Sequence, residues 1–559
     1  MEGFNDAPKQ SKHNTLKFHT HLNFTPISCI KCQNRVSLWG AMAFVKYDEN
    51  HKKVWIYSRK SKASSAKVRD VRWGDYLNIQ NQSDRWAEIK WGIKKYFIET
   101  KHITDERPLE VLFVDVGQGD GCIITSAETG ADERIYIMDA GDSRNMFDLV
   151  KWRFGKLKKF FKFAGAVITH PDADHYKGFQ RLFDHNNVGF DKVYHNGLLE
   201  RTGDDLLGPS DPSGRYLTDI IDTDAKARNL YADPAVRGRK LFPKLLHTAI
   251  TSGGRIGDIE MLAVGKGQIE GAHTYLPEFA PSDGKDATIE IIGPIPETLN
   301  GETALRWFGS DIGSGAKDNG KTKNGHSVLM QLKVKNFTLF FGGDLNRPAE
   351  DYLLRHYSGI EKDKPLSNAI NKAGQTLRSD MMKCCHHGAA DVTNEFIRTV
   401  DAFAFVVSSG DSESHAHPRP DLLGRLGKLA RGDTPMIFCT EILRSTDQGG
   451  TKKRFTALRK LDRELAKLKD QIADLVQNGQ DTSETKNIVK DKTKGRKELQ
   501  KSIEKGVIGV YVAITLRTDG KRMEISFRLE SPRGKQLWQS YRLENKDGTD
   551  WHIVSEGAH

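Results

Sequence analysis

The chain has 559 residues, of which 85 are lysine or arginine and 74 are aspartate or glutamate, giving a formal net charge of +11. This length exceeds what one ordinary hydrophobic core organises, so we expect a large catalytic domain with smaller modules. The apolar runs are too short for a membrane span, the N-terminus lacks a signal-peptide pattern, and the six cysteines show no disulfide-framework spacing. We therefore predict a cytoplasmic, reduced protein with no membrane partner.

The positive charge is distributed unevenly along the chain. Residues 41–101 carry 14 Lys and Arg against 7 Asp and Glu, and residues 451–505 carry 16 against 9. Outside these segments and residues 1–40, the remainder is net acidic. This distribution is expected if the basic modules bind a polyanionic substrate and present it to an acidic catalytic site. For each module alone, an ordinary solvated surface is an equal alternative.

Two small units precede the main domain. Residues 1–40 form a tail in which Cys29 and Cys32 have zinc-ligand spacing and upstream histidines would complete a site; free thiols in a small subdomain are the alternative. Residues 41–101 contain short aromatic strands divided by polar turns, which predicts a small β-barrel. The Gly-Asp turn in residues 71–77, followed by an aromatic strand in 83–89, resembles bacterial SH3-like barrels.

The segment around residue 170 has the strongest chemical signal. A strand, a loop and a second strand are predicted over residues 109–141, with Asp139 at a strand end. The apolar run 164–168 predicts a buried strand that leads into four ligand-type side chains: His170, Asp172, Asp174 and His175. Alternate residues of an extended segment share a face, so these side chains can converge. Carboxylates and imidazoles together indicate a metal site, whereas a polar loop with a helix N-cap is the alternative.

Further ligand-type residues follow later strands. Residues 201–284 are rich in Gly and Asp and indicate a lid or rim insertion. Asp344 ends the apolar run 339–343, and a buried carboxylate is costly unless it is paired or bound to metal. The other candidates are His326 before the strand 328–332, the pair His386 and His387, and His417.

A helical segment interrupts the strands near the C-terminus. Leucine and isoleucine recur at spacings of three and four between residues 458 and 475, and a second basic helix follows Gly479. The apolar face formed by these residues either packs within a helical hairpin or forms a dimer interface. Strand patterns resume after the hairpin, so residues 451–505 are predicted to be an insertion and residues 506–559 to complete the catalytic domain of 105–450.

Five motifs, taken in their order along the chain, resemble the metallo-β-lactamase superfamily. They are the loop Val114–Asp120, His170-x-Asp172-x-Asp174-His175, Gly342-Gly343-Asp344, His386-His387-Gly388 and His417-Pro418. Asp172 stands where the superfamily usually has a second His, as in the branch that includes the nuclease domain of competence (DNA-uptake) proteins. That branch tends to have Asn and Ser where Asn324 and Ser327 stand. The resemblance implies an α+β, four-layer αββα fold, here with the SH3-like barrel and the helical hairpin added.

The resemblance also implies roles for the motif residues. His170 and Asp172 would hold one ion with His326 or solvent, and Asp174, His175 and one of His386 and His387 would hold a second, with Asp344 bridging. Asp174 and His417 would be catalytic, His417 protonating the leaving group or gripping a phosphate. The carboxylate-rich ligand set makes Mn²⁺ a rival to Zn²⁺, at two divalent ions per chain. The predicted substrate-binding residues are Gln118, Asp120, Lys177, Ser409 and His415.

The expected activity is metal-assisted hydrolysis of phosphodiester bonds in nucleic acid, DNA foremost. One alternative is a small-molecule hydrolase of the same fold that cleaves an ester, a lactone or a cyclic nucleotide. Another is a non-enzymatic nucleic-acid-binding scaffold. A second copy of the chain or a partner protein would bind through the hairpin or the SH3-like unit.

Overall fold

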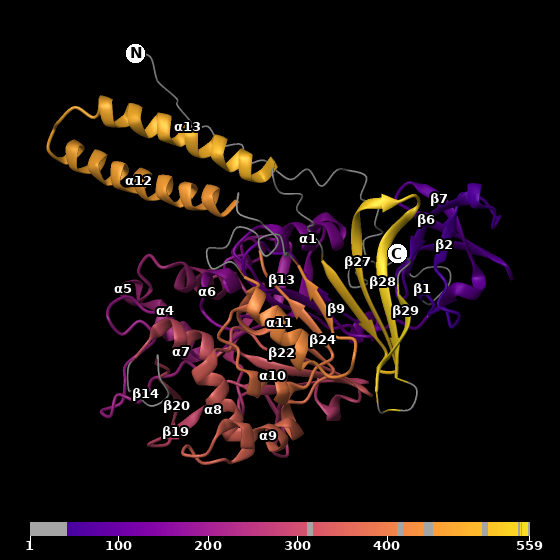
Figure 1. Cartoon of the computed structure of the whole chain (residues 1–559), viewed down its shortest axis with the longest axis horizontal. Coiled ribbons are helices and arrows are strands. Elements are labelled where there is room, and N and C mark those ends of the chain that lie inside the picture. The colour runs from indigo at the N-terminus through magenta and orange to yellow at the C-terminus, as the bar shows by residue number, and fades with distance from the viewer. Residues whose placement is uncertain are drawn as a thin grey trace.

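The computed structural model describes residues 42–309, 317–410, 417–440, 451–505, 513–545, 548 and 550–556. Cys29, Cys32 and His415 lie outside these residues. The described chain is a mixed α/β protein built around two large β-sheets (Figure 1). Among its described helices, none combines the length and the apolar character needed to cross a membrane.

The first large sheet has ten strands and joins distant parts of the sequence. Its order is β15 (Ile256–Met261), β13 (Val188–His195), β12 (Phe161–Val167), β11 (Ile135–Ala140), β10 (Gly121–Thr125), β9 (Leu109–Phe113), β26 (Ile514–Thr518), β27 (Arg522–Arg533), β28 (Gln536–Glu544) and β29 (His552–Glu556). Strands β11, β12, β13 and β15 are parallel. Strand β26 pairs antiparallel with β9, so the strands after the hairpin extend this sheet.

The second large sheet has eight strands. Its order is β16 (Gln268–Glu270), β17 (His273–Tyr275), β18 (Ala287–Gly293), β21 (Leu329–Val334), β22 (Phe337–Phe341), β23 (Met381–Lys383), β24 (Ala404–Val407) and β25 (Met436–Cys439). Strands β22 to β25 are parallel. Both sheets therefore contain a parallel run whose carboxyl ends can carry functional loops.

The core lies between these sheets, and helices cover their outer faces. Along β9, Val111 and Phe113 join a cluster with Leu339 of β22, whereas Leu112 joins a different cluster, as expected from the two-residue period of a strand. That second cluster packs the first sheet against α1 (Asn145–Arg153), α3 (Phe179–Phe183), α4 (Asp224–Ala232) and α6 (Leu241–Ile250). A third packs the second sheet against α8 (Arg347–Ser358), α9 (Ile370–Leu377), α10 (Asn394–Val400) and α11 (Pro420–Leu429). Cys384 and Cys385 belong to this third cluster.

The remaining strands of the described chain form three smaller sheets. The N-terminal β unit holds a five-stranded sheet, β3 (Lys67–Val71), β2 (Val54–Tyr57), β7 (Lys94–Glu99), β6 (Trp86–Trp91) and β5 (Ile79–Gln82), and a three-stranded sheet, β4 (Tyr76–Leu77), β1 (Ala43–Val45) and β8 (Ile103–Thr104). The region predicted as a rim insertion contributes β14 (Tyr216–Leu217), which lies in a sheet with β20 (Glu302–Arg306) and β19 (Glu297–Leu299).

A buried ion network fastens the N-terminal β unit to the ten-stranded sheet. Arg517 of β26 contacts Asp75 of the unit at 2.9 Å and Glu110 of β9 at 2.8 Å. Burial raises the pKa of Glu110, but Arg153 and Arg517 lower it more, so the net pKa lies well below its usual value. The carboxylate therefore stays charged and paired, which satisfies an otherwise costly buried group.

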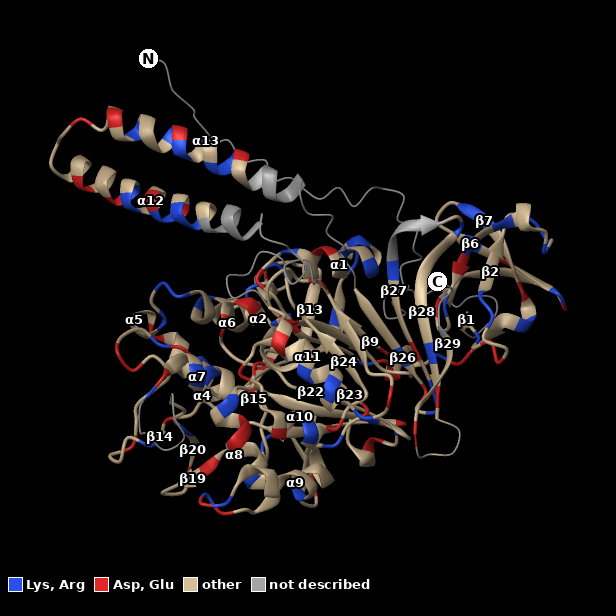
Figure 2. Cartoon of the chain, viewed as in Figure 1, with Lys and Arg blue, Asp and Glu red and all other residues tan. Residues whose placement is uncertain are grey.

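Two long helices stand apart from the layered body. Helices α12 (Thr451–Gln477) and α13 (Ser483–Lys505) run side by side (Figure 1). Lys492 of α13 pairs with Glu464 of α12 at 2.6 Å, and Arg496 pairs with Asp462. Ion pairs therefore join the two helices, and Figure 2 shows both basic and acidic residues along the described part of the hairpin.

Candidate metal centre

The predicted ligand motifs meet at the carboxyl ends of strands from both large sheets. Strand β12 ends just before His170, β22 just before Asp344 and β23 just before His386 and His387. Short α2 (Ala173–Tyr176) places His175 beside them. Four side chains, Asp120, His175, Asp344 and His387, bring ligand-type atoms within 4.8 Å of one another, and all four are buried.

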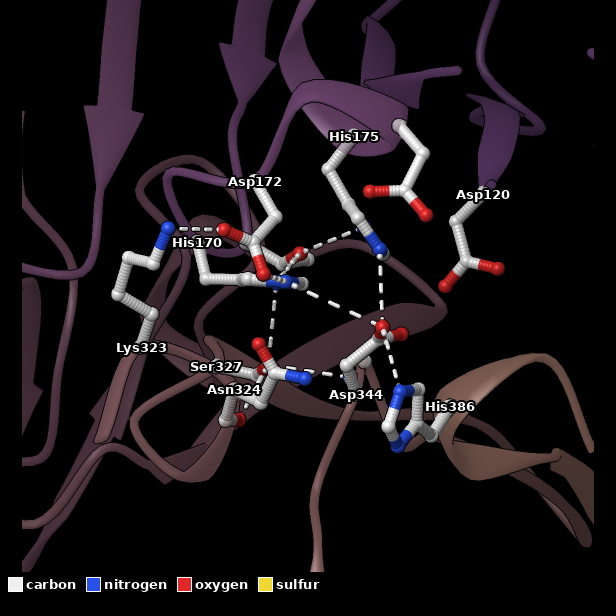
Figure 3. A network of polar contacts seen from close by, with 12 residues as sticks. Asp120, His170, Asp172, His175, Lys323, Asn324, Ser327, Asp344 and His386 are labelled. Carbon is white, nitrogen blue, oxygen red and sulfur yellow. Dashed lines mark hydrogen bonds and ion pairs between the residues drawn. The ribbon is translucent and has the colours of Figure 1, made fainter. Parts of the chain in front are cut away.

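Three of these atoms form a compact triangle. Nε2 of His175 lies 3.3 Å from Nε2 of His387, and the two nitrogens lie 3.2 Å and 3.1 Å from Oδ2 of Asp344. Ligands bonded at about 2.05 Å to a tetrahedral zinc ion lie roughly 3.3 Å apart. The triangle therefore has the dimensions of one face of a metal coordination shell, and Figure 3 shows His175 directed at Asp344.

The outer nitrogen of each imidazole is held by a carboxylate. Nδ1 of His175 lies 2.8 Å from Asp139, and Nδ1 of His387 lies 3.1 Å from Asp120. With Nδ1 as the donor, Nε2 of each ring is left with a lone pair directed at the triangle, as in protein metal sites. Asp139 also accepts hydrogen bonds from the amide and hydroxyl of Thr169, at 2.8 Å and 2.7 Å, so its position is fixed from several sides.

The electrostatics of the cluster favour bound positive charge. Burial lowers the pKa of His175, but Asp344 and Asp139 raise it well above its usual value. Burial raises the pKa of Asp344, but His175 and His387 hold it well below its usual value. Oδ1 of Asp344 is also buried and accepts no hydrogen bond from the described residues. A buried carboxylate with an unused oxygen between imidazole nitrogens fits a metal ligand.

Asp174 and Gln118 border the triangle. Oδ2 of Asp174 lies 3.5 Å from Nε2 of His387 and accepts a hydrogen bond of 3.1 Å from Gln118. The loop carrying Gln118 reaches this point because Gly119 has a φ of +102°, and a Cβ there would lie 1.7 Å from the backbone oxygen of Asp174. Gly119 thus permits a close approach that other residues would block.

His170 and Asp172 form the other side of the centre. Nε2 of His170 lies 3.7 Å from Asp172 and 3.9 Å from Asp344, so its contacts are wider than those in the triangle. Asp172 occupies the N-cap position of α2, yet its side chain makes no capping hydrogen bond. Its carboxylate instead pairs with Lys323 of α7 (Asn319–Gly325), as Figure 3 shows.

His326 does not take the predicted ligand position, and this prediction is corrected. Its Nε2 lies 2.7 Å from the backbone oxygen of Arg306, and its ring packs against Phe308 at 4.7 Å. Burial lowers the pKa of His326 to about 4, so the ring is neutral and structural. The neighbouring Ser327 faces the centre instead: its hydroxyl lies 3.3 Å from Nδ1 of His170 and accepts the Asp344 amide at 3.0 Å.

The remaining predicted residues lie at differing distances from the triangle. His417 lies close to the paired histidines, its ring 5.6 Å from that of His386 and 6.4 Å from that of His387. His386 approaches Asp344 at 3.9 Å. Ser409 is buried, and its backbone exchanges hydrogen bonds with the Thr440 hydroxyl, whereas Lys177 is exposed.

Sequence reasoning missed two lysines. Lys383 is buried and pairs with Asp120, and its Nζ also lies 3.3 Å from the backbone oxygen of Gly343. Asp120, predicted to bind substrate, therefore sits within the ligand cluster. Lys323 pairs with Asp172. A signal for Lys383 existed in the sequence, because a lysine inside an apolar strand must find a buried partner.

Comparisons with known proteins give little guidance. No protein-family model matches the sequence, and no curated protein matches it. Among matching solved structures is a mutant of the CmlA β-hydroxylase, 11% identical, with a TM-score of 0.28. The match covers 61% of this chain and 54% of that protein, about half its length. A likeness at this score carries no functional argument, so function must be argued from the centre itself.

Proposed function

We propose that this protein is a metal-dependent hydrolase with the four-layer αββα fold of the metallo-β-lactamase superfamily, and that it cleaves phosphodiester bonds in nucleic acid, DNA foremost. The observation that carries the proposal is the triangle of His175, His387 and Asp344, with edges of 3.1 to 3.3 Å and carboxylates behind both imidazoles. The layered sheets and the order of the motifs support the fold assignment.

The residues present fit a divalent ion, Zn²⁺ or Mn²⁺, because the donors are imidazole nitrogens and carboxylate oxygens. His175, His387 and Asp344 would hold it, with Asp174 at the edge. Such an ion supplies a Lewis acid and a water of lowered pKa.

The chain's own side chains would then complete the reaction. Gln118 orients the Asp174 carboxylate through its 3.1 Å hydrogen bond, which leaves the other oxygen able to accept a proton from the attacking water. His417, whose ring lies 5.6 Å from that of His386, would donate a proton to the leaving oxygen.

A basic hollow at helix α6 supports the choice of a polyanionic substrate. It has a volume of about 340 Å³ and is lined by Pro234, Arg237, Gly238, Arg239, Lys244 and His247. Helix α6, which carries Lys244 and His247, packs on the metal loop through a contact of 4.9 Å between the rings of Phe242 and Tyr176. Arginine and lysine side chains in such a hollow suit backbone phosphates.

The test is incubation of metal-depleted protein with circular DNA, linear DNA and RNA after adding Mn²⁺, Zn²⁺ or Mg²⁺. We expect cleavage that requires Mn²⁺ or Zn²⁺, is lost in Asp344→Asn, and shows binding that weakens steeply with salt. Cleavage of lactones or small esters without nucleic-acid cleavage would favour the small-molecule alternative. Salt-sensitive binding without any cleavage would favour the scaffold alternative.

A further inference from the structure

The two halves of the centre differ in how their carboxylates are neutralised. In the half formed by His175, His387 and Asp174, the carboxylate of Asp174 contacts the imidazole of His387 at 3.5 Å and the neutral amide of Gln118, whereas the ammonium of Lys383 pairs with Asp120, the carboxylate at the outer nitrogen of His387. In the half formed by His170 and Asp172, the carboxylate of Asp172 is already paired with the ammonium of Lys323. The charge that a second metal ion would balance there is therefore balanced by the chain.

The contacts of Asp172 use both of its oxygens. Oδ1 pairs with Lys323, and Oδ2 accepts a hydrogen bond of 2.9 Å from the amide of Asn324, in the orientation where the same amide nitrogen also donates to Gly320 at 3.1 Å. In Figure 3, Lys323 lies to the left of this carboxylate and Asn324 lies below it. Asp172 is thereby oriented by α7 and held away from the triangle.

Lys323 is itself anchored and largely enclosed. Its side chain is 14% exposed, and its Nζ contacts Glu200 at 3.3 Å in addition to Asp172. The ammonium lies between two carboxylates, and a second cation at Asp172 would meet its repulsion at short range.

Among the described residues, Nε2 of His170 has no ligand-type partners as close as those within the triangle. Its Nε2 lies 3.7 Å from Asp172 and 3.9 Å from Asp344, whereas the triangle edges are 3.1 to 3.3 Å. Its Nδ1 faces two hydroxyls, Thr169 at 3.1 Å and Ser327 at 3.3 Å, and not a carboxylate. The Nδ1 atoms of the triangle histidines thus face carboxylates, whereas Nδ1 of His170 faces hydroxyls.

We infer that Lys323 takes the place of a second metal ion beside Asp172, so that the centre binds one divalent ion tightly, at His175, His387, Asp344 and Asp174. This differs from the two ions that the sequence motif predicts. The inference rests on the metal binding in the proposed function, and it does not depend on which bond is hydrolysed.

The test is a count of metal ions by elemental analysis and by calorimetric titration of metal-depleted protein with Mn²⁺ and Zn²⁺. Wild type is expected to bind about one ion per chain. Lys323→Met, which removes the charge and retains much of the length, is expected to bind about two. Lys321→Met on the same helix is the matched control, because Lys321 forms no ion pair with a described residue. It should stay at one.

Two further variants keep the inference falsifiable if Lys323→Met folds poorly. Lys323→Gln removes the charge but can still hydrogen-bond to Asp172, and should also gain the second ion. Asp172→Asn in the wild-type background should keep the single ion, whereas Asp174→Asn should bind it more weakly. Two ions in wild type, or one ion in every folded Lys323 variant, would overturn the inference. No ion in wild type would instead contradict the proposed function.

Discussion

Asp139 is expected to control metal affinity without touching the ion. It accepts from Nδ1 of His175 at 2.8 Å and has a left-handed backbone conformation with φ of +52°. Asn tolerates this conformation nearly as well as Asp, so Asp139→Asn changes the hydrogen bonding and not the fold. The new amide can donate to Nδ1, which would place the ring proton on Nε2, the atom directed at Asp344.

Loss of such a supporting carboxylate typically lowers metal affinity by about 10- to 100-fold, or roughly 1.4 to 2.7 kcal/mol. Competition against a chromophoric chelator at pH 7.5 measures the change in Kd, and thermal unfolding with and without metal should show a smaller metal-induced stabilisation. Asp401→Asn is the matched control, because Asp401 also has a positive φ, of +50°, and caps α10 away from the centre. Wild-type affinity in Asp139→Asn would refute the reasoning.

Three further outcomes are expected. Asp174→Ala or Asp344→Ala should abolish hydrolysis and keep the circular dichroism of wild type, since each removes a carboxylate from the centre; full activity at limiting metal would contradict this. His417→Ala should reduce turnover more than metal content, and parallel loss of both would make His417 a ligand. Replacing residues 451–505, which carry 16 Lys and Arg against 9 Asp and Glu, by a short Gly-rich linker should preserve metal binding but weaken binding to long DNA and flatten its salt dependence. An unchanged salt slope would exclude the hairpin as a contact, and a change from dimer to monomer by light scattering would assign it to association.

Local patterns predicted much of the centre. His170, Asp172, Asp174 and His175 follow one buried strand within six residues, and Asp344 ends another, so strand periodicity and the cost of burying carboxylates sufficed to single them out. Asp139 was also visible as a strand-end residue. Its contact with His175 joins the end of β11 to α2, which follows the neighbouring parallel strand β12, and the sequence alone does not specify this pairing.

Tertiary packing decided the rest. His326 follows the last turn of α7 as its C-cap, with φ of −99° and ψ of 28°, and this geometry turns its ring to the Arg306 carbonyl while Ser327 faces His170. The spacing of apolar residues does not determine which of two adjacent residues at a helix end points to the centre. The role of Lys323 could not be predicted for a related reason, because its partner Asp172 lies on a loop distant in sequence that α7 contacts only in the folded chain.

Anomalous diffraction from crystals grown with Zn²⁺, recorded on both sides of the zinc absorption edge, tests the central claim most directly. The account predicts a strong peak bonded by Nε2 of His175, Nε2 of His387 and Oδ2 of Asp344. A difference map with no peak among these atoms, in crystals whose ordered zinc lies elsewhere, would contradict the assignment of this cluster as the metal centre.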